Sequence, residues 1–240
     1  MGKKLASLRS TAVAIVFQII IGVAPCVAQG KAASDIYPAQ ASLNQYFMAD
    51  RDSEIELACS SAPKSISDGA EVMVLGPEGY TIAVKGTNGF LCIVERSWGA
   101  ATDDPEFWNP KVRAPICFNP MARNSVVSIY LLKTKLVLAR NSRAEIAHSI
   151  ASALERKEVP GLEPGAMCYM MSKQQYLNDR DMNWHPHLMF FVGGDAAGSW
   201  GANLPGSPVM AANDPEERMT ILMVWAGQWS DGTPAPLMVH

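Results

Sequence analysis

Residues 70–95 read AEVMVLGPEGYTIAVKGTNGFLCIVE and contain three apolar runs, 70–75, 80–84 and 90–95, separated by two glycine-rich turns. The second turn contains Asn88-Gly89, and Asn-Gly between apolar runs is typical of a β-hairpin because both residues tolerate a positive φ. The stretch therefore predicts a three-strand antiparallel meander. Its last run is apolar on both faces until Glu95, which predicts a central strand that is covered on both sides.

The rest of the chain adds strands, helices and two long irregular segments to this meander. Further strands are predicted at 166–172, 187–194 and 220–226, and the irregular segments span 96–120 and 195–218. Helices are predicted from a Ser42/Gln45 capping box to Pro63, over 121–140, and from a Ser142/Glu145 capping box onward. The predicted class is α+β, with an antiparallel sheet of five or six strands, two or three packed helices and long aromatic and Pro-Gly loops.

The first 28 residues have the pattern of a signal peptide. Three basic residues, Lys3, Lys4 and Arg9, precede an apolar run that is too short to span a bilayer, and Ala28 lies where a signal peptidase would cut. Acylation of Cys26 as a lipoprotein is the alternative, although a proline precedes it. We therefore expect a periplasmic or secreted protein.

Within the mature chain we expect a flexible N-terminus at 29–41, a single α+β domain at 42–236 and a tail at 237–240. No later stretch reaches the roughly 18 consecutive apolar residues of a membrane helix, so no membrane span is expected in the mature chain.

Composition limits the classes of function. A chain of 240 residues with 48% hydrophobic residues is long and apolar enough to bury a core. Removal of the leader takes away three basic and no acidic residues, so the formal charge moves from −3 to −6. Because such a surface repels phosphate backbones, nucleic acid is excluded as the expected partner.

The mature chain keeps four cysteines, Cys59, Cys92, Cys117 and Cys168. An even number in an exported chain favours disulfides, and the sequence does not rank the three possible pairings. Free buried thiols are the alternative, and no CxxC spacing suggests a zinc or redox site.

The clearest chemical signal is WHPHLMFF at 184–191. His185 and His187 are two residues apart and could bind one metal ion, with a third ligand from Glu95, Asp179, Asp181 or Asp195. The alternative is a His187 bonded to the backbone and a solvated His185. No phosphate-binding or serine-hydrolase motif follows a strand, and we expect no cofactor.

Three segments, GTNGFLCIVERSW, HPHLMFFV and WGANLPGSPV, resemble a group of uncharacterised exported bacterial proteins with a GTNGF-x-C-x-VER signature and a PHLMF strand. The resemblance covers most of the chain, from about Leu43 to about Pro234. It implies export and a single domain but no activity. It draws attention to the motif residues Gly89, Cys92, Glu95, Arg96 and His187, although Glu95 and Arg96 could equally form an ion pair at a strand end.

The predicted function is binding of a small ligand or an envelope protein in a cleft lined by long loops. The expected cleft residues are Trp98, Trp108, His185, His187 and Trp200. The tryptophans of the first loop could instead plug the sheet edge. One alternative is an envelope hydrolase, with or without metal, that uses His187 with Glu95 or Cys92. Another is a structural envelope component without a site.

Overall fold

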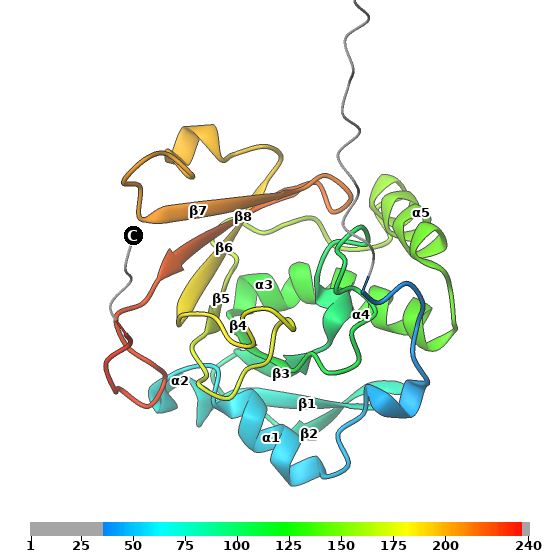
Figure 1. Ribbon diagram of the computed structural model, residues 1–240, viewed down its shortest axis with the longest axis horizontal. Coiled ribbons are helices and arrows are strands. Elements are labelled where there is room, and N and C mark those ends of the chain that lie inside the picture. The colour runs from blue at the N-terminus through cyan, green and yellow to red at the C-terminus, as the bar shows by residue number, and fades with distance from the viewer. Residues whose placement is uncertain (1–35, 237–240) are drawn as a thin grey trace, which may run out of the picture. The chain divides into compact units, whose positions relative to one another are not determined.

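The computed structural model describes residues 36–236 and has one eight-stranded sheet with helices packed on it (Figure 1). The predicted α+β class is confirmed, but five or six strands is too few. The predicted leader at 1–28, residues 29–35 and the tail at 237–240 lie outside the described residues. The strands are β1 (Glu71–Gly76), β2 (Gly79–Val84), β3 (Leu91–Glu95), β4 (Ala114–Phe118), β5 (Met167–Met170), β6 (His187–Gly193), β7 (Val209–Asp214) and β8 (Met219–Trp225).

The strands lie in the order β2-β1-β3-β4-β5-β6-β8-β7, and all neighbours are antiparallel except β1 and β3. The predicted meander is therefore wrong at its third strand. The connection that contains Asn88 crosses the start of β1, where the N–H groups of Thr87 and Asn88 donate to the carbonyl of Gly69. Gly86 makes this crossing possible, because a Cβ there would lie 2.3 Å from the backbone nitrogen of Glu71.

Two strands were missed because their composition resembles a loop. β4 contains Pro115, and a proline normally argues against a central strand because it has no N–H to donate. In β4 it is tolerated because β5 pairs only with Cys117 and Phe118 and requires no N–H donor at position 115. β7 is rich in alanine, and its place at the edge of the sheet next to β8 requires little side-chain burial.

The helices are α1 (Arg51–Cys59), α2 (Lys64–Ser67), α3 (Pro120–Asn124), α4 (Val126–Leu138) and α5 (Arg143–Glu155), with 3-10 turns η1 (Leu43–Gln45), η2 (Ser97–Gly99) and η3 (Gly198–Trp200). The Ser142/Glu145 capping box is confirmed. The Ser42 box is wrong, since Asp50 caps α1 instead and its carboxylate accepts from two backbone N–H groups. The helix predicted at 121–140 is divided at Ser125 into α3 and α4.

Different helices cover the two faces of the sheet at β1 and β3 (Figure 1). Leu91, Ile93 and Ile116 point to the face that packs against α4, and Cys92 and Cys117 point to the face that packs against α1. These two cysteines are opposite each other in β3 and β4 and form a disulfide. The prediction of disulfides is therefore confirmed for one pair, whereas Cys59 and Cys168 are free thiols.

None of the helices within residues 36–236 combines the length and apolar character that crossing a membrane requires. Residues 36–41, which belong to the predicted flexible N-terminus, are bonded to the rest of the fold. The Tyr37 hydroxyl donates to Asp179, and the Gln40 side chain donates to the carbonyl of Val137.

Candidate functional site

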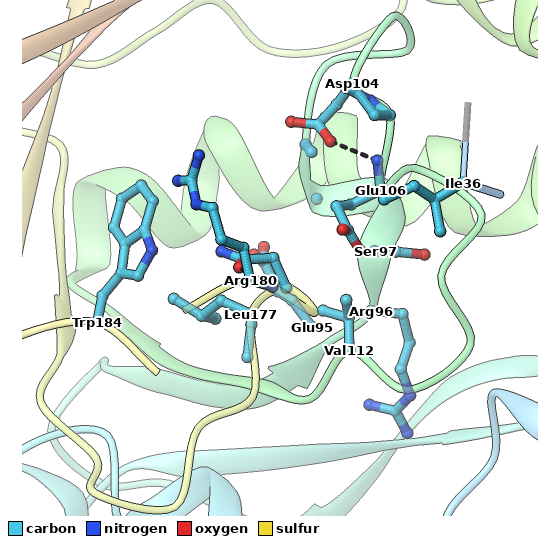
Figure 2. Close-up of a pocket in the computed structure, with 15 residues that line it drawn as sticks. Ile36, Glu95, Arg96, Ser97, Asp104, Glu106, Val112, Leu177, Arg180 and Trp184 are labelled. Carbon is cyan, nitrogen blue, oxygen red and sulfur yellow. Dashed lines mark hydrogen bonds between the residues drawn. The ribbon is translucent and has the colours of Figure 1, made fainter. Parts of the chain in front are cut away.

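A cavity of about 500 Å³ with a mixed lining of apolar, polar and charged residues lies where β3 ends (Figure 2). We call it the outer cleft. One wall is the segment from Glu95 through η2 to Val112, and the other is the loop from Leu177 to Trp184. Ionisable groups on both walls face the cavity, and they are Glu95, Asp104, Glu106 and Arg180.

Strand alternation separates the two charged residues at the end of β3. Glu95 is opposite Ala114 in β4 and points to the α4 face, where both residues line the outer cleft. Arg96 points the other way (Figure 2). Its guanidinium is fully buried and donates to the Glu54 carboxylate of α1 at 2.8 Å and to the carbonyl of Tyr46. An ion pair between Glu95 and Arg96 is therefore wrong, because Arg96 pairs with Glu54.

A second cavity of about 190 Å³ lies between the sheet and α4, and we call it the inner chamber. Glu95 and Gly99 line both cavities, so these residues lie between the outer cleft and the inner chamber. The chamber is mostly apolar. Its apolar side chains come from β4, β5, β6, β8 and α4, and they are Ile116, Phe118, Val126, Met170, Met189, Phe191, Met219 and Ile221.

Four acidic or basic side chains, Glu95, Lys133, Asp214 and Glu217, line the chamber. The buried Lys133 ammonium of α4 forms an ion pair with Glu217 and donates to the carbonyl of Ala100 at 3.2 Å. Burial raises the pKa of the Glu95 carboxyl to about 8, the Lys133 ammonium opposes that rise, and the Glu217 carboxylate adds to it. Burial also raises the pKa of Glu217. The Lys133 ammonium pairs with Glu217, and Glu95, which has no ion-pair partner, holds its proton at neutral pH.

Glu95 has no direct polar partner. Within residues 36–236, no group donates a hydrogen bond to its carboxyl and no cation forms an ion pair with it. The Cβ that an alanine would have at position 99 would lie only 2.7 Å from its Oε2, so the glycine leaves the space that the carboxyl occupies. The carboxyl is therefore free to interact with a molecule that enters from either cavity.

The tryptophans of the first loop lie in the core. Trp98 is fully buried and its indole N–H donates to the Thr134 hydroxyl at 2.9 Å, and Trp108 is 4% exposed beside Phe107. Neither is among the described residues that line the outer cleft, whereas Asp104 and Glu106 of the same loop are. The tryptophans of the loop therefore plug the core, as the alternative interpretation expected, and its carboxylates rather than its tryptophans line the cleft.

The histidines are part of an aromatic cluster at the ends of β6 and β8. The Nδ1–H of His187 donates to the carbonyl of His185 at 2.8 Å, and burial lowers the pKa of His187. His185 lies 5.9 Å from Trp225 and 6.3 Å from Trp229 between ring centroids, so it is half-buried rather than solvated. The cluster reaches the outer cleft only through Trp184.

His187 is distant from the other residues of the predicted catalytic group. Strands β4 and β5 separate it from Glu95, which corresponds to roughly 14 Å at ordinary strand spacing. Cys92 is bonded to Cys117 on the opposite face of the sheet. Over the described part of the chain, no three His, Cys, Asp or Glu side chains are grouped to hold a metal ion.

The remaining predicted residue, Trp200, is 48% exposed and stacks on Phe190 away from the outer cleft. Sequence reasoning did not single out Lys133, Glu217, Arg180 or Trp184. An acidic residue directly after four apolar strand residues was a usable signal for Glu95, because strand alternation predicts a buried side chain there. No signal in the sequence connects the turn that contains Glu217 with α4.

The chain was also compared with known proteins. No known protein family, curated protein or solved structure matches it.

Proposed function

We propose that the protein binds a small ligand in the outer cleft and that the Glu95 carboxyl recognises the polar part of that ligand. The observation that carries this proposal is a carboxyl without a polar partner that lies between two cavities. Burial of an ionisable group without a partner destabilises a fold, so such a group in a cavity favours a functional role. The cavity volume of about 500 Å³ lies in the range of small-molecule sites.

We propose further that binding takes place in the periplasm or outside the cell. The Cys92–Cys117 disulfide supports this location, because disulfides persist in oxidising compartments. The predicted leader and the resemblance to exported bacterial proteins agree with it.

A second candidate is a hydrolase in which Glu95 is a general acid and base. It is favoured by one observation, the pKa of about 8, because proton transfer is most efficient when the pKa lies near the working pH. The two candidates differ in turnover. A binding protein returns the ligand unchanged, whereas a hydrolase converts it, and the Glu95→Gln variant of a hydrolase would bind the ligand without converting it.

The binding proposal is tested by removing and restoring small molecules. Wild type, Glu95→Gln and a control variant, Glu78→Gln in the exposed β1–β2 turn, are dialysed exhaustively and their melting temperatures are measured. The small-molecule fraction released by denaturing freshly purified wild type is then added back. A ligand that binds only the folded state raises the melting temperature.

We expect the fraction to raise the melting temperature of wild type and Glu78→Gln but not that of Glu95→Gln. An equal rise in all three proteins would overturn the role of Glu95. No rise in any of them would favour a structural envelope component without a site.

A further inference from the structure

We propose that the ligand is an amine with an apolar substituent, whose ammonium group pairs with Glu95 and whose substituent fills the inner chamber. This inference rests on the proposed function, because it names the class of ligand for the same cleft. It follows from the charges of the outer cleft, the lining of the inner chamber and the position of Glu95 between them.

The charges of the outer cleft favour a cation. The carboxylates of Asp104 and Glu106 line it, and Glu95 adds a third negative charge once it has lost its proton. The guanidinium of Arg180, which also lines it, already donates to Asp181 at 2.7 Å. Asp104 accepts the N–H of Glu106 through one oxygen, and Glu106 accepts from Asn109 through one oxygen, so each keeps a second oxygen for a ligand. A ligand carboxylate would face repulsion here, and an ammonium group would not.

The inner chamber favours an apolar substituent. Met170, Met189 and Met219 contribute flexible thioether side chains, which adapt to ligands of different shape. The chamber's only ammonium group, that of Lys133, is already paired with Glu217 and bonded to a backbone carbonyl. A polar ligand group placed among the apolar side chains of the chamber would lose its hydrogen bonds to water without replacement, while each methylene group that enters would tighten binding about fourfold.

The position of Glu95 connects the preference of the outer cleft for a cation with the preference of the inner chamber for an apolar substituent. Because Glu95 and Gly99 line both cavities, an ammonium group held by the carboxyl lies at the entrance to the chamber. A substituent on that nitrogen then has the chamber on one side and the outer cleft on the other. The short distance from position 99 to the Glu95 Oε2 makes the width of this entrance sensitive to a single methyl group.

Proton release distinguishes an amine from other ligands. Glu95 holds its proton at pH 7, and pairing with an ammonium group requires it to lose that proton, so each binding event should release about 0.9 proton at pH 7. Affinity should rise about tenfold from pH 6 to pH 7 and level off above pH 8. The ionisable groups that interact electrostatically with Glu95 are Lys133 and Tyr130 of α4, Cys168 of β5, Glu217 of the β7–β8 turn and Tyr80 of β2, and Asp214 of β7 lines the same chamber. Across the outer cleft it faces Asp104, Glu106 and Arg180.

The test is isothermal titration of the full protein with n-alkylamines from ethylamine to octylamine. n-Hexanol and n-hexanoate are the matched neutral and anionic probes. Two variants accompany wild type. Met189→Phe partly fills the chamber from β6, and Met73→Phe makes the same change at a half-buried methionine of β1 that does not line it. The chain-length series on wild type requires no variant, so the proposal stays testable if Met189→Phe does not fold.

We expect n-hexylamine to bind more tightly than n-hexanol, n-hexanoate not to bind, and affinity to rise with chain length until the chamber is full. Met189→Phe should shorten the longest chain that still gains affinity, and Met73→Phe should not. Binding of n-hexanoate or n-hexanol at least as tight as that of n-hexylamine would overturn the amine inference and leave the proposed function standing. Failure of every amine to bind would also overturn the amine inference. The proposed function is decided separately, by the experiment that adds the released small-molecule fraction back to the dialysed protein.

Discussion

Replacement of Glu95 by glutamine should make the protein more stable, and the gain should depend on pH. The two side chains have nearly the same shape, but glutamine has no proton to lose. The Glu95 carboxyl has a pKa of about 8 in the folded protein and about 4.3 in the unfolded chain. Between these values the folded state holds a proton that the unfolded state has released. The free energy of unfolding of wild type therefore falls as the pH rises through this window, and the fall stops above pH 8.

The magnitude follows from the width of the window. Each pH unit between about 5 and 8 lowers the free energy of unfolding of wild type by about 1.4 kcal/mol. Over the whole window the loss is at most about 4 kcal/mol. Because the carboxyl is partly accessible from the outer cleft, solvent reduces the effect, and we expect about 2 to 4 kcal/mol. Glu95→Gln should match wild type near pH 5 and exceed its stability by this amount at pH 8 and above.

The assay is urea unfolding at pH 5 to 9, followed by tryptophan fluorescence with the disulfide intact. Other groups also titrate in this range. One of them is His187, whose pKa is lower in the folded than in the unfolded protein, so the free energy of unfolding decreases as the pH falls and the unfolded chain binds the proton first. Since they titrate in both proteins, the difference between Glu95→Gln and wild type isolates the carboxyl. The control Glu78→Gln changes an exposed side chain. A Glu95→Gln difference that is constant from pH 5 to 9 would refute a protonated Glu95.

Three further predictions concern single contacts. Replacement of both Cys92 and Cys117 by alanine should lower the free energy of unfolding by about 3 kcal/mol, since the bridge closes a loop of 25 residues; an unchanged urea midpoint would contradict a stabilising bridge. Gly99→Ala should displace the neighbouring carboxyl and weaken binding of the released small-molecule fraction at least tenfold in equilibrium dialysis, with little change in melting temperature. Glu54→Gln should cost about 3 to 5 kcal/mol in urea unfolding, because it leaves the buried guanidinium of Arg96 without its carboxylate; a loss below about 1 kcal/mol would mean that the pair is dispensable.

Local patterns predicted the elements whose causes are local. The Ser142 box, the buried helix at α4 and the strands rich in branched and aromatic residues all follow from short-range chemistry. The turn at Asn88-Gly89 has a hairpin sequence but crosses over β1, because its amides bond to Gly69 and not to β2. Pro115 in β4 is tolerated only because of where β5 stops pairing. Both outcomes depend on contacts between distant segments, which periodicity does not encode.

The candidate site was predictable only where its residues differ from their sequence neighbours, because contacts between distant segments leave no local signal. Glu95 was visible as an acidic residue at the end of an apolar run. Lys133 could not be predicted as a site residue, because a lysine in a helix is normally at the surface. Its burial depends on the ion pair with Glu217 and on the hydrogen bond to the carbonyl of Ala100. The two histidines gave the strongest signal in the sequence, yet one is bonded to the backbone and the other packs between tryptophans.

The most direct test of ligand binding at Glu95 is native mass spectrometry of the protein, purified gently and without added ligand. We expect wild type and Glu78→Gln to carry the same additional small-molecule mass, and Glu95→Gln to carry none. The same additional mass on all three proteins, or on none of them, would contradict ligand recognition by the Glu95 carboxyl.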